Sequence, residues 1–223
     1  NTLGLSDKCV QGFDCAATLI KESPILGEVL QCQREQRIIG ISLLPVYSIY
    51  SGDVEKDANM VRSFAHCLES VLIKDNSISL RLFAFRTGTR HSDVPILEAL
   101  IREISVRPDD ITLVQYAGDV NSFSNSIGEC DFFIGMRYHA SVFAYLLNKP
   151  LIILDYMGKC NSLGRDIAID KTAIISIVDI LSLQFCDKVQ SFLSSPDRYI
   201  ANLPVNSAKM RAKMMFEKMG EEL

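Results

Sequence analysis

The sequence lacks the features that define several protein classes. No apolar run reaches the roughly 18 residues expected of a membrane-spanning helix. Basic residues are outnumbered, with 23 Lys and Arg against 27 Asp and Glu, and the formal net charge is -4. Because nucleic-acid binding depends on clustered cations, this balance argues against a general nucleic-acid binder. A site for a small phosphate compound needs only local positive charge and remains compatible with the composition.

Paired cysteines are also missing. The chain has seven cysteines, which are dispersed at positions 9, 15, 32, 67, 130, 160 and 186. A disulfide framework or a structural zinc site would need closer, paired spacing, such as Cys-x-x-Cys. We therefore expect free thiols, no metal site and a cytoplasmic location.

Apolar runs alternate with helical patterns along most of the 223 residues. Strands are predicted at residues 38–44, 79–85, 111–116, 131–135, 151–155 and 173–177. Helices are predicted at residues 54–73, 94–104, 120–128, 139–147 and 178–193. Strands that alternate with helices imply right-handed parallel crossovers. The fold class is therefore α/β, with a doubly wound, Rossmann-like parallel sheet.

We divide the chain into three segments. Residues 1–37 show no strand and helix repeat and are interpreted as an N-terminal or interlobe extension. Residues 38–206 form the Rossmann-like lobe, and residues 207–223 form a C-terminal helix. This helix mixes apolar and cationic side chains, so peripheral contact with the inner face of a membrane is one hypothesis. Packing against its own or a partner lobe is the interpretation we favour.

The predicted sheet places two polar side chains at a position where ligands bind. In the common strand order 3-2-1-4-5-6, the first and fourth strands are neighbours, and ligands bind above their carboxyl ends. The fourth strand leads into Arg137 and His139. These two residues therefore fall at the point where the winding direction changes.

Each of these residues suits the handling of an anion. The start of a helix favours negative charge through its free N–H groups and its dipole. Arg137 would add a planar fork for carboxylate or phosphate. His139 belongs to the residue type that titrates near neutrality, so it could transfer a proton, although capping or packing would also explain it. Lys159 follows the fifth strand and would open on the same side.

The loop after the second strand supplies a further candidate. Residues 86–93 contain arginines, a histidine and a glycine. Arg86 could reach a sugar or phosphate at the edge of the site. A polar turn that ends in a helix cap at Ser92 or Asp93 explains the same residues.

Four motifs follow one another in the region just described: Ile134-Gly135-Met136-Arg137-Tyr138-His139, Phe143-Ala144, Lys149-Pro150-Leu151-Ile152 and Tyr156-x-x-Lys159. They resemble the polysaccharide pyruvyl transferase family. Two upstream segments fit the same family: Gly12-Phe13-Asp14-Cys15-Ala16, with Cys15 where the family has proline, and Gly40-Ile41-Ser42-Leu43. The resemblance implies the second, C-terminal lobe of a two-lobed enzyme of glycosyltransferase type B (GT-B) architecture.

The resemblance also implies an activity in exopolysaccharide and cell-envelope biosynthesis. A pyruvyl group would pass from phosphoenolpyruvate to hydroxyls of a polysaccharide or its saccharide or lipid-linked precursor, leaving a ketal and phosphate. His139 would be the acid, Arg137 the main clamp and Lys159 a second charge, with Arg86 at the edge and no cofactor. The family has a first lobe before this region, so we expect the chain to be a fragment with little turnover alone.

Two other functions remain open at this stage. The same crevice in a nucleotide-sugar glycosyltransferase or epimerase lobe would bind a uridine diphosphate, with Asp166 or Asp170 as a candidate for the ribose. A noncatalytic ligand-binding domain is the other alternative. In that case replacing His139 by alanine would leave the function intact.

Overall fold

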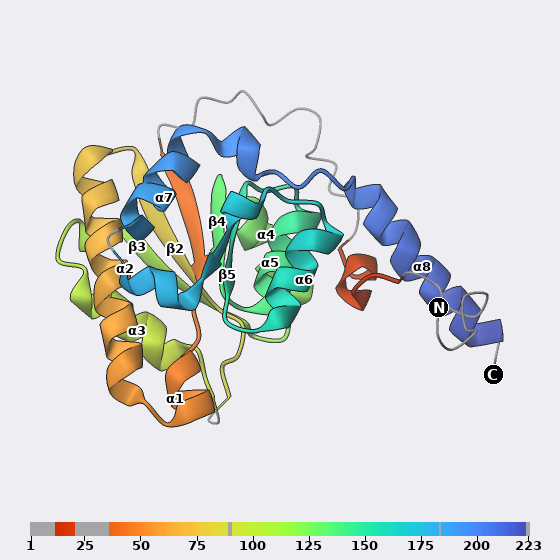
Figure 1. Cartoon of the computed structure of the whole chain (residues 1–223), viewed down its shortest axis with the longest axis horizontal. Helices are drawn as coiled ribbons and strands as arrows, with labels where there is room; N and C mark the ends of the chain where they lie inside the picture. The colour runs from red at the N-terminus through yellow and green to blue at the C-terminus, as the bar shows by residue number, and fades with distance from the viewer. Residues whose placement is uncertain (1–11, 21–35, 89–90, 183, 222–223) are drawn as a thin grey trace.

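Six parallel strands form one sheet in the computed structural model, which describes residues 12–20, 36–88, 91–182 and 184–221 (Figure 1). The strands are β1 (Arg37–Ser42), β2 (Ile78–Ala84), β3 (Ile111–Gln115), β4 (Phe132–Gly135), β5 (Leu151–Asp155) and β6 (Ile174–Ser176). Their order is β3-β2-β1-β4-β5-β6, and every pairing is parallel. The predicted fold class and strand order are therefore confirmed.

Helices cover both faces of the sheet, as Figure 1 shows. One face carries α2 (Val54–Lys74), α3 (Val94–Glu103) and α7 (Gln184–Ser194). The other carries α4 (Val120–Gly128), α5 (Tyr138–Leu146) and α6 (Gly158–Asp166). The helix α1 (Val46–Ser51) follows β1 directly. Because the sheet is covered on both faces, its strands consist mainly of buried apolar residues, which explains the runs seen in the sequence.

Short 3-10 helices connect several of these elements: η2 (Cys15–Thr18), η4 (Pro108–Asp110), η5 (Lys171–Ala173), η6 (Ile177–Leu181) and η7 (Pro196–Tyr199). The predicted helix at 178–193 is divided between η6 and α7, which is a correction. The helices α1 and α6 were not predicted. The sequence of α6 contains two glycines, an asparagine and a serine, so its helical pattern is weak.

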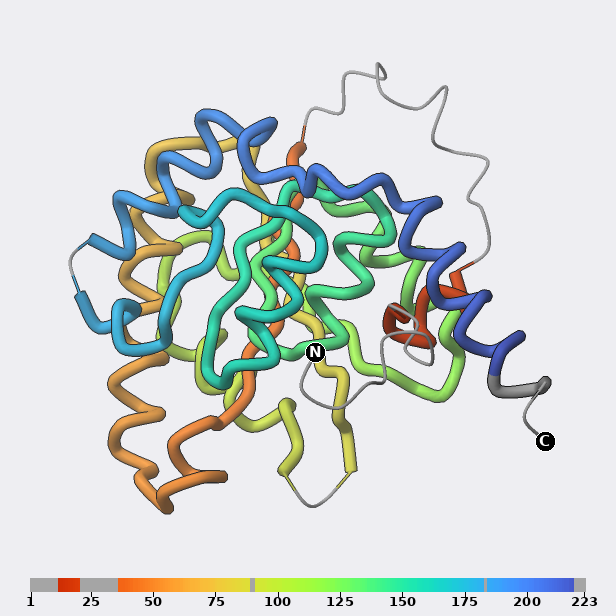
Figure 2. The backbone as a smooth tube through the Cα atoms, turned by 45° about the vertical axis from the view of Figure 1, so that its right-hand side comes forward, coloured from red at the N-terminus to blue at the C-terminus, as the bar shows by residue number. Residues whose placement is uncertain are grey.

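A third layer covers α5. The segment 12–20 lies against α5, and α8 (Val205–Glu221) packs on η2 within that segment (Figures 1 and 2). The rings of Phe13 and Tyr145 lie 5.7 Å apart, and the Tyr145 hydroxyl donates to the carbonyl of Leu203, 3.0 Å away. With the sheet on one side and this layer on the other, α5 is buried from Ala140 to Leu146.

The C-terminal helix has two different faces. Ala208 and Ala212 are fully buried, whereas Met210, Met214 and Phe216 are about half exposed. The helix begins at residue 205, two residues earlier than expected, and one of its faces packs on η2 of the segment 12–20. Contact with a membrane surface stays a prediction. Within the described part of the chain, no helix is long and apolar enough to span a bilayer.

Candidate functional site

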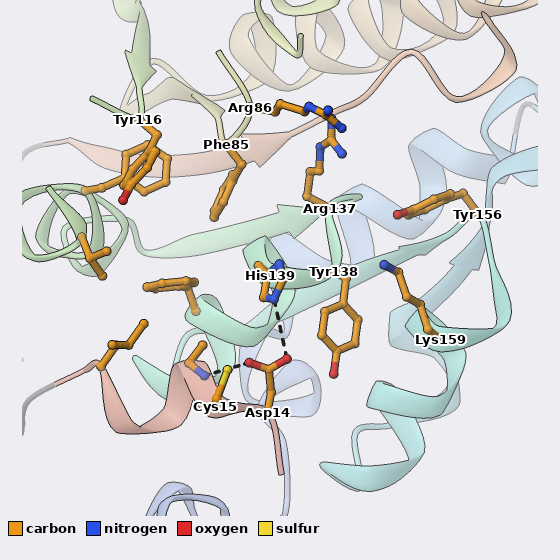
Figure 3. A pocket seen from close by; sticks show the side chains of 15 residues that line it. Asp14, Cys15, Phe85, Arg86, Tyr116, Arg137, Tyr138, His139, Tyr156 and Lys159 are labelled. Carbon is orange, nitrogen blue, oxygen red and sulfur yellow. Dashed lines mark hydrogen bonds and ion pairs between the residues drawn. The ribbon is translucent and has the colours of Figure 1, made fainter. Parts of the chain in front are cut away.

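A cavity of about 490 Å³ opens at the carboxyl ends of β2, β3, β4 and β5 (Figure 3). This is the edge of the sheet where parallel α/β folds bind ligands. The loops after the strands, the helices α4, α5 and α6 and the segment 12–20 supply its lining: Asp14, Cys15, Ala16, Leu19, Phe85, Arg86, Tyr116, Val120, Phe123, Arg137, Tyr138, His139, Phe143, Tyr156 and Lys159. The structure thus brings together all four residues proposed from sequence, Arg86, Arg137, His139 and Lys159.

Close packing between β4 and α5 directs the chain into the site. A Cβ atom added at Gly135 would lie 2.5 Å from the Ser141 side-chain oxygen and 3.2 Å from its backbone nitrogen. Glycine at this position therefore lets the first turn of α5 approach the end of the strand. Arg137 precedes the helix as its N-cap residue, and His139 occupies its second position.

One edge of the Arg137 guanidinium is hydrogen-bonded to the buried carboxylate of Asp93. Its Nε donates to the two oxygens of Asp93 at 2.9 and 3.1 Å, and its Nη2 also donates to Asp93. The Asp93 side chain is fully buried, while that of Arg137 is 19% exposed. No described residue pairs with Nη1. The sequence predicted Arg137 as the main anion clamp. In the structure the Asp93 carboxylate already neutralises part of the positive charge of Arg137.

Asp93 also fixes the loop after β2. Its Oδ2 accepts from the backbone N–H groups of Phe85 and Arg86, both at 3.0 Å. Ser92, by contrast, caps α3, because its hydroxyl oxygen accepts from the N–H of Val94 at 3.2 Å. Of the two predicted caps, Asp93 occupies the N-cap position but makes no side-chain capping bond, because its carboxylate connects the β2 and β4 exits, while Ser92 precedes it and accepts from Val94.

His139 lies at the open side of the cavity with 60% of its side chain exposed. Its Nε2 is 3.7 Å from the Asp14 Oδ2, as the dashed line in Figure 3 shows. The other Asp14 oxygen, Oδ1, accepts from the N–H of Ala16 at 2.8 Å and so caps η2. Asp14 was not proposed as a site residue from sequence. Its only sequence signal was membership of the segment that resembles the family's Asp-Pro-Ala motif.

Tyr138 connects three charged groups around the cavity. Burial raises the pKa of Tyr138 to about 12, and the carboxylates of Asp14 and Asp166 and a hydrogen bond with Asp14 add to the effect. Its phenol therefore stays protonated at neutral pH and can donate to a carboxylate. The Lys159 Nζ lies 5.2 Å from the centroid of the Tyr138 ring, in cation–π contact. Lys159 belongs to the first turn of α6, not to a loop as expected.

Aromatic side chains line the opposite part of the cavity. The rings of Phe85 and Tyr116 each contact Phe123 edge to face, with centroids 4.8 and 5.4 Å apart. Sequence reasoning missed these residues as site residues, because aromatic side chains at strand ends resemble ordinary core positions. They give the cavity an apolar wall opposite its cations (Figure 3).

The other sequence candidates lie outside this cavity. Asp170 accepts from the N–H of Thr172 at 2.8 Å and caps η5. Asp166 is exposed near the end of α6 and does not line the cavity. Among the described residues, no group of three or more His, Cys, Asp or Glu side chains could hold a metal ion. The thiols of Cys15, Cys67, Cys130, Cys160 and Cys186 are free, while Cys9 and Cys32 lie outside the described residues.

The Rossmann-like fold is similar to part of several solved structures. It is similar to the structure of S. aureus MnaA with UDP, with a TM-score of 0.57 and 11% identity over 95% of this chain and 50% of that one. It is also similar to sucrose-phosphate synthase from Thermosynechococcus elongatus, with a TM-score of 0.56 and 13% identity over 94% and 50%. A third similar structure is UDP-GlcNAc 2-epimerase from Neisseria meningitidis bound to UDP-GlcNAc, with a TM-score of 0.56 and 12% identity over 85% and 46%. The chain thus spans about half the length of these proteins.

The family is more specific than the fold. The model of the polysaccharide pyruvyl transferase family matches residues 2–157, which is more than half of the chain. The protein belongs to this family. A comparison with curated proteins finds no match.

Proposed function

We propose that the protein transfers the pyruvyl group of phosphoenolpyruvate to sugar hydroxyls of a polysaccharide or its precursor, with release of phosphate. Membership of the family supports the transferase class. The observation that carries the specific proposal is the combination of an exposed imidazole with three cationic side chains, Arg86, Arg137 and Lys159, in one cavity. Phosphoenolpyruvate carries a carboxylate and a phosphate, and its methylene carbon must be protonated for transfer to occur.

The charges of the site suit this donor. Arg86 and Lys159 are exposed and line the cavity, and the Lys159 ammonium lies over the face of the Tyr138 ring. The Nη1 group of Arg137 is available to hydrogen-bond to the donor, while Asp93 holds Nε and Nη2 of the guanidinium in place. We therefore assign Arg86 and Lys159 a larger share of anion binding than the sequence alone suggested. Arg137 contributes orientation as well as charge.

His139 is positioned to act as the acid. In the proposed scheme its proton is added to the methylene carbon of phosphoenolpyruvate, and the adjacent carbon becomes an oxocarbenium-like centre. A sugar hydroxyl attacks that centre, and a second hydroxyl displaces phosphate to close the ketal. The cations stabilise the negative charge of the carboxylate and of the departing phosphate. The aromatic wall provides an apolar surface for the ring of the acceptor.

The test is product formation by the whole protein. Phosphate release from phosphoenolpyruvate is measured across a panel of saccharide and lipid-linked saccharide acceptors, and ketal formation is detected by mass. We expect His139→Ala to lower the rate by about 100-fold or more while the protein still binds phosphoenolpyruvate. His66→Ala is the matched control, because His66 is exposed on α2 and does not line the cavity. Equal rates for both variants would contradict the assignment of His139.

A nucleotide-sugar enzyme is the second candidate. It is favoured by the solved structures with UDP or UDP-GlcNAc among the similar folds, and by the aromatic wall, on which a base could stack. Thermal unfolding with phosphoenolpyruvate, UDP and UDP-sugars separates the two functions, because a ligand that binds the native state raises its melting temperature. A shift with the uridine compounds alone would replace the pyruvyl transferase proposal.

A further inference from the structure

The proposed reaction needs a base as well as an acid. When a sugar hydroxyl attacks the protonated donor, its O–H proton has to leave. His139 cannot accept that proton while it is itself the proton donor. A second group at the cavity, within reach of the same reacting atoms, would let proton donation and proton removal take place together. The present inference rests on the proposed function and concerns this group.

Asp14 is the only carboxylate among the described residues that line the cavity. Its Oδ2 lies 3.7 Å from the His139 Nε2, so the two groups face the same space (Figure 3). The Asp14 side chain is 13% exposed, which leaves it open to a bound ligand but shielded from bulk water. The two reacting carbons of phosphoenolpyruvate are directly bonded, so a neighbouring acid and base match the spacing that the reaction needs.

The surrounding structure holds this carboxylate in position. Oδ1 accepts from the Ala16 N–H, Oδ2 lies 3.7 Å from the His139 Nε2, and the Tyr138 phenol is hydrogen-bonded to the same carboxylate. The neighbouring Phe13 packs on Tyr145 of α5, the helix whose first turn carries His139. The segment is covered in turn by α8. A functional group supported in this way has little freedom to lose when the substrate binds.

The nearby buried carboxylate of Asp93 is unsuited to this role. It accepts from two backbone N–H groups and is paired with Arg137, and it is fully buried. Its oxygens are occupied by these partners, and Asp93 does not line the cavity. Asp155, at the end of β5, is half-buried and does not line the cavity.

We propose that Asp14 is the general base of the transfer. Protonated His139 donates its proton to the methylene carbon, where the electron pair of the C=C π bond forms the new C–H bond. The acceptor oxygen forms a C–O bond to the adjacent, electron-poor carbon as its O–H bond breaks and the proton passes to Asp14. The proton then passes from Asp14 to His139, which restores both groups. In the second step a further hydroxyl forms the other C–O bond, the C–O bond to phosphate breaks, and that hydroxyl's proton leaves with the phosphate through Asp14.

The experiment compares two capping aspartates in the whole protein. Asp14→Asn retains an oxygen for the Ala16 N–H but removes the basic carboxylate. Asp170→Asn is the matched control, because Asp170 caps η5 with the same kind of hydrogen bond and does not line the cavity. We expect Asp14→Asn to lower kcat by about 100-fold, with the KM for phosphoenolpyruvate changed by less than about threefold, and Asp170→Asn to leave kcat unchanged.

Chemical rescue separates a base from a structural cap. Formate is added to Asp14→Ala, and its carboxylate should restore part of the lost kcat, whereas His139→Ala should not respond. Rescue tests the role of Asp14 as a base even if Asp14→Ala is less stable. Free formate can accept a proton in the cavity, but it cannot restore the side-chain cap of η2, which is part of the chain. An unrescued Asp14→Ala, or an Asp14→Asn as active as Asp170→Asn, would overturn the assignment of Asp14. Wild-type protein that forms no ketal from phosphoenolpyruvate would instead overturn the proposed function itself.

Discussion

Asp93 and Arg137 join the exits of β2 and β4 through a buried ion pair. Arg137 donates to the carboxylate from Nε and Nη2, and the same carboxylate accepts from two N–H groups of the β2 exit. These exits carry Arg86 and His139, which both line the cavity. The pair therefore sets the relative position of a substrate-binding candidate and the proposed acid.

Removing one member of this pair should destabilise the fold. We expect Asp93→Ala to lower the free energy of unfolding by about 3–5 kcal/mol, because it leaves a mostly buried guanidinium and two N–H groups without their partner. Urea unfolding monitored by circular dichroism measures the change. Asp179→Ala is the control, since Asp179 pairs with Lys188 at 3.3 Å on the surface and should cost at most about 1 kcal/mol. Similar losses in both variants would contradict a special role for the buried pair.

A methyl group at Gly135 should move the first turn of α5. The added Cβ would overlap Ser141, so Gly135→Ala should lower the free energy of unfolding by about 1–3 kcal/mol and reduce activity through a displaced His139. Unfolding curves and phosphate release measure the two effects. Gly88→Ala, whose added Cβ meets nothing within 4 Å, should change neither. A fully stable and active Gly135→Ala variant would show that α5 tolerates the displacement.

Thiol labelling should report on occupancy of the cavity. Cys15 is exposed and lines it, whereas burial raises the pKa of Cys130 to about 12 and that of Cys160 to about 11. At pH 8 both raised values leave these two thiols almost entirely protonated, so they react slowly with maleimide. We expect peptide mapping by mass spectrometry to find Cys15 modified faster than either. Phosphoenolpyruvate should slow its modification, and an unchanged rate at saturating ligand would place the donor elsewhere.

Acid should weaken the start of β1 through Asp75. Hydrogen bonds from Ser77 lower the pKa of this carboxyl, and the ion pair with Arg37 lowers it further. Because the folded pKa is the lower one, the stabilisation is complete above the unfolded value of about 4 and is lost as pH falls through the folded value. Asp75→Asn should therefore reduce the difference between the urea midpoints at pH 7 and pH 3. Asp109→Asn, at an exposed position, serves as the control, and an equal effect there would refute the assignment.

The regular part of the fold follows from local sequence patterns. The central strands β4 and β5 were predictable because they are short apolar runs that are buried on both faces, and α2 and α3 because their apolar residues recur at helical spacing. In contrast, α6 was missed, since its composition is poor in helix formers. The common strand order predicts Arg137 and His139 above the carboxyl ends of neighbouring strands, and the structure confirms that order.

The sequence by itself determined the α/β class, because buried periodic patterns and parallel crossovers permit few arrangements, and with the common strand order as a premise it indicated the region of the site. Only the tertiary structure decided which charges face one another. It paired Arg137 with Asp93, and it brought Asp14 from the segment before β1 to His139. Such contacts depend on how separate segments pack across α5, and no local periodicity encodes them. The chemistry assigned to each side chain therefore depends on packing between residues far apart in sequence.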